Sequence, residues 1–365
     1  MKTLTRCICP LMSLVILTIP AYFGKNTRSQ LKRGLRLIQP ETVVYKDHAS
    51  FQQKVQTEDL PDDWMSPSCV QSLLDSEKAI IASPTLGETS MKFSILLHPL
   101  SKDKYITAGV LRHGAYEHGI GQFITNALPI TDNAASDKNS AIQRPWAVDV
   151  GANVGFHGLH MARRGANVIA FEPAPDTFEL LQCSADLLGS VANSLTPSAG
   201  FVKVFQAGAS DAESEGEMVR HPGSPGMTTF GNLEKIIGED KAEKLSGDMI
   251  KLVRVENILV ELGVPEGPSD LLRLLKVDAE GFELRAFRGI NLERFPFQFL
   301  IYELFPTMLE NAGSDPVDVL VLLRDAGYKC NSDELAGDTR ETMNKWVSSF
   351  LPQNHMNVFC ELKRT

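Results

Sequence analysis

The sequence predicts an α/β domain with a doubly wound, mostly parallel sheet and helices on both faces. From Trp146 onward, short apolar runs alternate with segments of helical periodicity, which is the pattern of successive βαβ units. The first apolar run ends in a turn that contains Gly151 and Gly155, and the second ends in an acid, Glu172. Because ligands bind beyond the carboxyl ends of the strands in such sheets, we expect the functional site at that edge.

The predicted elements follow one another from this point to the end of the sequence. Gly165 directly follows the first helical segment and is a typical helix terminator. Upstream, the apolar segments 92–97 and 105–111 predict two further strands, and 132–140 is a polar loop. In the α/β region we expect strands over 146–150, 167–171, 201–205, 271–277, 298–302, 328–331 and 356–362, and helices over 156–164, 176–188 and 316–326.

The composition is that of a globular protein with a sizeable core. The 365 residues are 43% hydrophobic and 22% charged, and the formal net charge is −9. A protein that binds nucleic acid needs a basic face, so the charge balance predicts no nucleic acid partner. We expect an N-terminal extension over 63–135 and the α/β domain over 136–365.

The amino terminus has the pattern of a membrane-targeting segment. Lys2 and Arg6 precede an uncharged run of 18 residues, Cys7–Gly24, which lies between the length of a signal-peptide core and that of a membrane span. No clean small-x-small cleavage site follows, so we expect 1–24 to be an uncleaved signal anchor, with a cleaved signal peptide or a transit peptide as alternatives. A polar stem over 25–62 follows. The predicted protein is a single-pass membrane protein of the endoplasmic reticulum or Golgi, or else secreted or organellar.

The cysteines show no metal-binding spacing. There are six, and they form neither a C-x-x-C pair nor a cluster with histidine. We expect mostly buried or free thiols, with a single disulfide as the alternative. The six are Cys7, Cys9, Cys69, Cys183, Cys330 and Cys360.

The glycine turn favours an adenosine ligand. Its skeleton is Asp149-x-Gly151-x-Asn153-x-Gly155, and Glu172 follows Asp149 by 23 residues, where an acid can bind both hydroxyls of a ribose. Asn153 stands where a dinucleotide fingerprint has the glycine that admits a pyrophosphate, so S-adenosylmethionine (SAM) fits better than a dinucleotide. A plain βα turn without ligand and a nicotinamide-dependent oxidoreductase are the alternatives.

The stretch LLKVDAEGFELRAF places charged side chains where a buried strand meets a helix. Charged groups are seldom buried unless they are paired or functional. Asp278 and Glu280 follow the strand, so either is a candidate general base, and together they are candidate ligands of a divalent cation. Lys276 is expected to pair with one of them. Asp278 has a second reading as a helix cap, and Glu283 is expected to be a carboxylate of the helix start.

Five blocks of the sequence, in order from about Ala147 to Pro306, resemble the FkbM family of SAM-dependent methyltransferases. A shorter block, HGAYE at His113–Glu117, resembles one that often precedes them. The resemblance implies a class I methyltransferase (Rossmann-like) fold and an O-methyltransferase that acts on a hydroxyl of a sugar or a natural product. The blocks are VDVGANVGFHGL, VIAFEPAPDTFELL, AGASD, LLKVDAEGFELRAFRG and IYELFP.

The resemblance also implies roles for particular residues. Glu172 holds the ribose, and Ser210 and Asp211 lie at the edge of the adenine. The cofactor loop consists of Asp149, Gly151, Ala152, Asn153 and Gly155.

Other candidates follow from their positions around the predicted site. Glu303 ends the fifth strand and is a third acidic candidate for catalysis, or else a salt-bridge partner. His157, on the helix after the glycine turn, is a candidate to reach the acceptor, although packing within the helix is the commoner use of such a histidine. Tyr116 and Glu117 are expected to cover the site on the substrate side. The glycine- and proline-rich loop 221–229 is expected to shape the acceptor pocket.

Together these observations predict a membrane-anchored, SAM-dependent O-methyltransferase for a glycan or small-molecule hydroxyl, with a divalent cation as a possible second cofactor. A protein that binds SAM without turnover is the alternative from another functional class, because fold does not imply activity. A nicotinamide-dependent oxidoreductase is the third.

Overall fold

The computed structural model describes residues 68–86, 91–129, 143–195, 199–221, 224–230, 243–244 and 249–363. All of them belong to one structural unit, residues 55–365. The predicted signal anchor (1–24) and stem (25–62), and the polar loop 132–140, lie outside the described residues.

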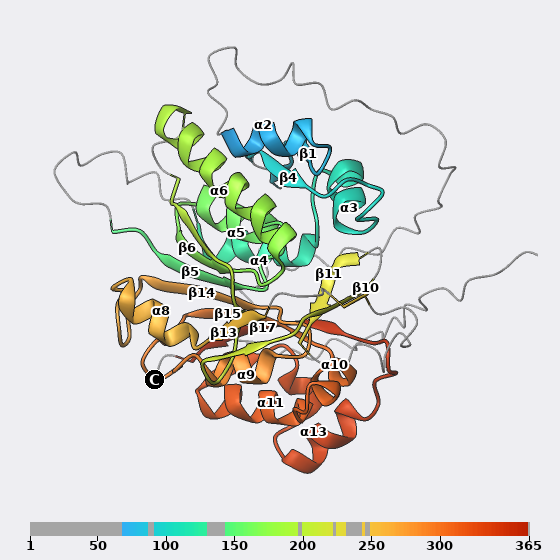
Figure 1. Ribbon diagram of the computed structural model, residues 1–365. Coiled ribbons are helices and arrows are strands. Elements are labelled where there is room, and N and C mark those ends of the chain that lie inside the picture. Colours follow the sequence, from blue (N-terminus) through green and yellow to red (C-terminus); the bar gives the residue numbers. More distant parts are fainter. Residues whose placement is uncertain are drawn as a thin grey trace, which may run out of the picture. The chain divides into compact units, whose positions relative to one another are not determined.

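A seven-stranded sheet forms the centre of this unit (Figure 1). Its order is β16-β17-β15-β14-β5-β6-β7, and β17 runs antiparallel to both of its neighbours while the other pairs between β15 and β7 are parallel. The predicted mostly parallel sheet is therefore confirmed. The strands are β5 (Trp146–Val150), β6 (Asn167–Phe171), β7 (Val202–Phe205), β14 (Leu272–Val277), β15 (Phe299–Leu304), β16 (Tyr328–Cys330) and β17 (Met356–Leu362).

Helices cover both faces of the sheet because alternate side chains of each strand enter two separate cores. Ala147 and Leu274 pack in one core with the helices α5 and α6, and Val148 and Leu275 pack in the other with the helices α8, α9, α11 and α13 (Figure 1). These helices are α5 (Phe156–Arg163), α6 (Pro175–Leu195), α8 (Val255–Glu261), α9 (Glu283–Arg288), α11 (Pro316–Asp325) and α13 (Arg340–Val347). Two short helices, α10 (Pro306–Asn311) and α12 (Asp333–Ala336), complete this half of the domain.

The N-terminal extension shares the core of α5 and α6. The backbone N–H of Leu96 donates to Ser184 Oγ of α6 at 2.9 Å, and His98 Nε2 lies 3.1 Å from Thr177 Oγ1 of the same helix. The extension is therefore part of the domain rather than an appendage. Its elements are α2 (Ser68–Asp75), β1 (Ile80–Ala82), β2 (Thr85–Leu86), β3 (Met91–Lys92), β4 (Ile95–Leu97), α3 (Ile106–His113) and α4 (His118–Ala127).

The strand predicted over 105–111 is wrong, because this segment forms α3. The carboxylate of Asp103 accepts hydrogen bonds from the backbone N–H groups of Tyr105, Ile106 and Thr107 at 2.9–3.2 Å, which satisfies the open donors of a helix start. Gly114, in the left-handed conformation at φ 66°, ends the helix. These local hydrogen bonds override the β-propensity of the branched residues within the segment.

Two three-stranded sheets lie beyond the central one, in addition to the two-stranded pairs β1-β4 and β2-β3. The first has the order β8-β13-β9 and the second the order β11-β10-β12. Strands β10 and β11 form a hairpin that projects toward the carboxyl edge of the central sheet (Figure 1). The bounds are β8 (Gly208–Ala209), β9 (Ser214–Gly216), β10 (Val219–His221), β11 (Ser224–Thr229), β12 (Glu243–Lys244) and β13 (Ile250–Val253).

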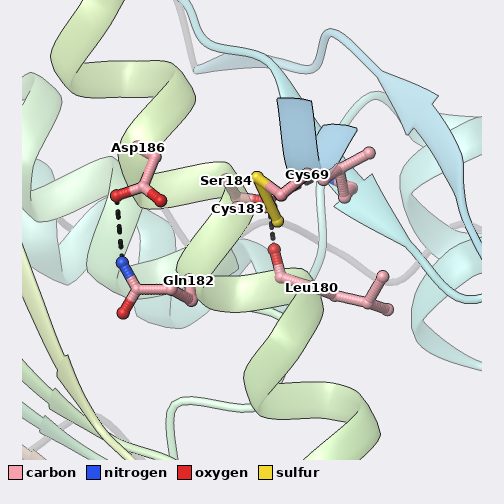
Figure 2. The surroundings of a disulfide bond; sticks show 7 residues. Cys69, Leu180, Gln182, Cys183, Ser184 and Asp186 are labelled. Carbon is pink, nitrogen blue, oxygen red and sulfur yellow. Dashed lines mark hydrogen bonds between the residues drawn. A yellow bond between two sulfur atoms is a disulfide. The ribbon is translucent and has the colours of Figure 1, made fainter. Parts of the chain in front are cut away.

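The prediction of mostly buried or free thiols, with a single disulfide as the alternative, is wrong about the free thiols, because four of the cysteines form two disulfides. Cys69 of α2 bonds to Cys183 of α6, as Figure 2 shows, and Cys330 of β16 bonds to Cys360 of β17. The first bond ties the N-terminal extension to the domain across 114 positions of the sequence. Sequence spacing did not reveal either pair, since both bonds join elements that only the tertiary fold brings together.

The predicted single-pass membrane localisation is also corrected. Within the described parts of the chain, no helix has both the length and the apolar character needed to cross a bilayer. The segment 1–24, on which that prediction rested, is outside those parts.

Removing the disulfide between Cys69 and Cys183 should destabilise the protein. The double substitution Cys69→Ser and Cys183→Ser is expected to lower the free energy of unfolding by about 2–4 kcal/mol, because a long loop is no longer closed in the unfolded chain. The matched control is Cys330→Ser with Cys360→Ser. The disulfide that it removes closes a loop of only 30 positions, so the loss of unfolding free energy should be about 1 kcal/mol smaller by loop entropy. Urea unfolding of both variants measures the difference, and equal losses would contradict it.

Candidate active site

The glycine turn joins three strands at the carboxyl edge of the sheet. The N–H groups of Gly151 and Ala152 donate to the carbonyl of Phe171, at the end of β6, at 3.0 and 2.9 Å. Gly151 has φ 69°, and a Cβ there would lie 1.7 Å from the backbone oxygen of Asp278, which follows β14. Only glycine permits both this conformation and this close approach. The turn therefore brings the predicted cofactor loop directly against the acidic segment.

A hydrogen bond joins the backbone of Asn153 to the carboxylate of Glu172 across this turn. The N–H of Asn153 donates to Glu172 Oε2 at 2.8 Å, and that of Ala174 donates to Oε1 at 2.9 Å. Burial raises the pKa of Glu172 to about 7, although the two backbone N–H groups and nearby Arg220 oppose that rise. The carboxyl group predicted to hold a ribose thus lies beside the loop and titrates near neutral pH.

Lys276 is the buried cation of the site. Its Nζ lies 3.2 Å from Asp149 Oδ1 and 3.3 Å from Asp278 Oδ2, and it donates to the carbonyl of Gly151 at 3.3 Å. Burial alone would lower the pKa of Lys276, but the carboxylates of Asp149, Asp278 and Glu117 outweigh burial and raise it. Lys276 therefore stays charged and connects the ends of β5 and β14.

Asp149 is completely buried below α5. The ion pair with Lys276 lacks hydrogen-bond geometry, and neither carboxylate oxygen of Asp149 has a hydrogen-bond partner among the described residues. The structure thus places the side chain of this predicted cofactor-loop residue against the lysine rather than at an open surface.

Asp278, Glu280 and Glu303 come together in one cluster at the ends of β14 and β15. One carboxylate oxygen of each lies within 4.8 Å of the others, and all three side chains are half-buried. Burial, together with repulsion from the neighbouring carboxylates, raises the pKa of Glu280 and of Glu303 well above the ordinary value. These three residues, called the acidic cluster below, have the chemistry of a proton acceptor or of a cation site.

Two alternatives for the acidic segment are now resolved. Asp278 does not cap the following helix, since α9 starts after Phe282 without a side-chain cap and Asp278 pairs with Lys276 instead. Glu283 is fully buried and accepts hydrogen bonds from the N–H groups of Ala279 and Gly281 at 2.9 and 3.1 Å. Glu283 thus stabilises the turn before the helix, as expected for a carboxylate of the helix start.

Glu117 lies near enough to the acidic cluster for its charge to raise the pKa of the cluster's carboxyl groups. His157 Nε2 lies 2.9 Å from Glu117 Oε2, and Asn357 Nδ2 of β17 donates to Oε1 at 3.3 Å. Burial would raise the pKa of Glu117, but the contacts with His157 and Lys276 lower it to about 2. His157 itself is buried, so the structure makes it a support for Glu117 and does not bring it to an open surface.

Tyr116 packs beside the same pair. Its ring centroid lies 6.1 Å from that of His157. Burial and the negative charges of Glu117, Asp278, Glu303 and Glu280 raise the pKa of its hydroxyl, so Tyr116 keeps its proton and can donate a hydrogen bond.

Ser210 and Asp211 lie in the connection after β8. Ser210 is buried, its N–H donates to the carbonyl of Val253 at 2.9 Å, and its Oγ donates to Asp211 Oδ1 at 3.2 Å. Arg254 Nη1 donates to the carbonyl of Asp211 at 2.5 Å. Their contacts are thus with the segment between β13 and α8, and the adenine edge assigned to them stays a prediction.

Sequence reasoning missed Asn357 and His355. His355 Nε2 lies 3.7 Å from Glu303 Oε1, and its ring packs 5.4 Å from that of Phe305. Both residues lie at the beginning of β17, which meets the carboxyl ends of β15 and β14 only because β17 is antiparallel. The strand was predicted, but its antiparallel direction was not, and only that direction brings Asn357 and His355 to the site.

Backbone strain is concentrated at the same place. Four non-glycine residues of the described chain have left-handed φ, and three of them are Glu117, Asn153 and Glu280, at φ 46°, 52° and 48°. Such conformations cost roughly 1–3 kcal/mol each and persist where surrounding contacts enforce them, often at functional sites.

Comparison with known proteins identifies the family of the domain that contains the glycine turn and the acidic cluster. A family model described as the methyltransferase FkbM domain matches residues 149–330. These residues belong to the FkbM methyltransferase family. Among the curated relatives of this FkbM domain, methyltransferase sdnD of Sordaria araneosa is 29% identical over 52% of the chain and 75% of its own length. The nicotinamide alternative is thereby removed, and the enzyme is a SAM-dependent methyltransferase.

Two further relatives carry more specific names. Hexuronic acid methyltransferase AglP of Haloferax volcanii is 32% identical over 51% of the chain and 66% of its own length. The 31-O-demethyl-FK506 methyltransferase FkbM of Streptomyces tacrolimicus is 28% identical over 40% of the chain and 60% of its own length.

Replacing the buried lysine should destabilise the domain strongly. Lys276→Met leaves the buried Asp149 and the half-buried Asp278 without their cation, and breaking the buried pair of Lys276 with Asp149 is expected to cost about 3–5 kcal/mol of unfolding free energy. Arg294→Met, which breaks an exposed pair with Glu266, is the matched control and should change the stability little. Urea unfolding measures both, and similar losses would refute a special role for Lys276.

Proposed function

We propose that the enzyme transfers the methyl group of SAM to a hydroxyl of a glycan or small-molecule acceptor. The observation that carries the proposal is the acidic cluster, which lies directly against the glycine turn through the contact of Gly151 with Asp278. An alcohol is a poor nucleophile until its proton is taken up. A group of carboxylates beside a SAM loop supplies that function.

The residues present fit SAM. Glu172, which accepts a hydrogen bond from the cofactor loop, would accept from the ribose hydroxyls, and Asn153 in place of a glycine suits a ligand without a pyrophosphate. Glu117 stays ionised, and a bound cation would favour the ionised forms of Glu280 and Glu303, whose pKa values are raised, because the nearby Lys276 is already paired with Asp149 and Asp278. Such an environment stabilises a cation. When bound, SAM supplies the methyl group and the positive charge of its sulfonium.

Within the cluster, Glu280 and Glu303 are the better candidates for the proton acceptor. Lys276 holds Asp278 in an ion pair, whereas no lysine or arginine in the described chain is paired with Glu280 or Glu303. Either carboxylate, once ionised, would accept the proton of the acceptor hydroxyl while the methyl carbon leaves the sulfonium sulfur of SAM and bonds to the acceptor oxygen, which leaves S-adenosylhomocysteine. Tyr116 and Glu117 would orient the hydroxyl. Alignment of this kind supplies much of the rate enhancement in a displacement reaction.

A divalent cation is the second candidate for the cluster. Three carboxylates within 4.8 Å of one another are hard oxygen ligands that suit Mg²⁺, and a bound cation would polarise the acceptor hydroxyl instead of a base removing its proton.

The names of the relatives support an oxygen acceptor. One acts on a hexuronic acid and another on a 31-O-demethyl compound. The alignments cover 66% and 60% of the lengths of these two relatives. The acceptor hydroxyl of this chain is therefore proposed and is not taken over from them.

SAM binding should strengthen as the pH rises through about 7. Glu172 must be ionised to accept from both ribose hydroxyls, and its pKa is raised to about 7, so the carboxyl is protonated below that pH and the contact is weakened. Isothermal titration between pH 6 and 8 measures the dissociation constant. Glu172→Gln should bind SAM about 10-fold more weakly at pH 8 and lose the pH dependence; a variant that keeps both would refute the assignment.

Loss of the proton acceptor should affect turnover rather than cofactor binding. Glu280→Gln and Glu303→Gln are expected to lower kcat by about 10²- to 10⁴-fold for the residue that acts as base, with SAM affinity within about threefold of wild type. Methyl transfer from labelled SAM into a panel of monosaccharides, hexuronic acids and polyketide alcohols gives the rates. SAM binding without transfer to any of them would favour the inactive binding protein.

Chelation separates the two readings of the cluster. With a carboxylate as the base, turnover should be unchanged after dialysis against EDTA. A loss that Mg²⁺ restores, with Ca²⁺ as the comparison ion, would assign the cluster to a cation instead.

A further inference from the structure

The β10–β11 hairpin contacts the two halves of the site that the proposed reaction must align. We infer that β11 is a positioning element of the site: Gly226 leaves room for the side chain of Asn153 in the cofactor loop, Thr229 holds the peptide of Glu280, and the strand between them borders the space that the acceptor enters. This inference rests on the proposed function, and it extends it to residues outside the acidic cluster and the glycine turn.

The hairpin is anchored at its β10 strand by a buried ion pair. Arg220 donates through Nη2 and Nη1 to Asp176 Oδ1 and Oδ2 at 2.6 and 3.0 Å, and its side chain is only 7% exposed. Lys102 of the N-terminal extension pairs with the same carboxylate. Asp176 lies in the first turn of α6, shortly after Glu172. The two-point contact of a guanidinium with a carboxylate fixes direction as well as distance, so β10 is held to the cofactor side of the sheet.

Gly226 of β11 lies directly against Asn153. A Cβ at position 226 would be 2.5 Å from Asn153 Nδ2 and 3.3 Å from Ile106 Cδ1 of α3. Asn153 has left-handed φ, and its Oδ1 accepts a hydrogen bond from the N–H of Val154 at 2.8 Å. The absence of a side chain at Gly226 therefore leaves room for the side-chain amide of Asn153.

Thr229, at the end of β11, is bonded to the acidic segment. Its Oγ1 donates to the backbone carbonyl of Glu280 at 2.7 Å, and Thr229 is buried. Glu280 is another of the left-handed residues, so its peptide needs outside contacts to keep its direction. The hydrogen bond fixes that peptide, and with it the direction in which the carboxylate of Glu280 projects.

These contacts have a common consequence. Asn153 and Glu280 follow two adjacent strands, β5 and β14, and both are strained. One short strand contacts both, so a shift of β11 would change the distance and angle between the methyl donor and the proton acceptor. Displacements of about 1 Å at this level can change a rate by two orders of magnitude.

The first test uses the hydroxyl of Thr229. Thr229→Val removes the donor while keeping the shape, and it should lower kcat about 10-fold with the SAM dissociation constant within twofold of wild type. Thr229→Ser, which keeps the hydroxyl, should restore most of the rate. Thr125→Val is the matched control, because Thr125 Oγ1 likewise donates to a backbone carbonyl, that of Gly121, outside the site. Rates are measured with the acceptor of the panel that wild type methylates fastest.

The second test uses Gly226 and does not depend on turnover. Gly226→Ala should displace Asn153 and raise the SAM dissociation constant about 10-fold by isothermal titration, with the melting temperature close to that of wild type. If wild type binds SAM but methylates no acceptor, the proposed function fails while this measurement still decides the inference. The inference is overturned if Gly226→Ala binds SAM normally, or if Thr229→Val changes kcat no more than Thr125→Val does.

Discussion

The site depends on one buried ammonium group. Lys276 and Asp149 are register partners on adjacent strands, β14 and β5, and the lysine also reaches Asp278 and the carbonyl of Gly151. Without that positive charge, the buried Asp149 and the half-buried Asp278 would repel each other where the glycine turn approaches the acidic segment. Because the partners come from different strands, the same interaction fixes the sheet register and the distance between the cofactor loop and the acidic cluster.

Around this pair, negative charge and backbone strain accumulate together. Glu280 and Glu303 have raised pKa values, Glu117 is held ionised by His157 and Lys276, and both Glu117 and Glu280 have left-handed backbones. Stability alone would not select such an arrangement, because each feature costs free energy. A cationic ligand relieves the electrostatic part of that cost, the hydrogen bond from Thr229 holds the strained peptide of Glu280, and Asn357 holds the carboxylate of Glu117.

Most features of the fold that depend on neighbouring residues could be predicted from the sequence, whereas those that depend on contacts between distant segments could not. Periodicity predicted all seven strands of the central sheet, and the order of strand ends predicted that Asp149, Glu172, Asp278, Glu280 and Glu303 gather at one edge. The strand predicted over 105–111 is a helix, α3, because Asp103 accepts hydrogen bonds from the backbone at the helix start. Residue propensities alone do not predict such a contact. Both disulfides, the direction of β17 and the position of the β10–β11 hairpin depend on contacts between distant segments. A single sequence gives no signal for these.

The antiparallel course of β17 has a consequence for how the chain is made. Glu117 and its partner Asn357 are separated by 240 positions, and β5 must likewise wait for its central neighbour β14. At about 5–20 residues per second, the ribosome needs roughly 12–50 s between synthesising the two ends of that hydrogen bond. Assembly of this edge of the sheet is therefore a late event of biosynthesis.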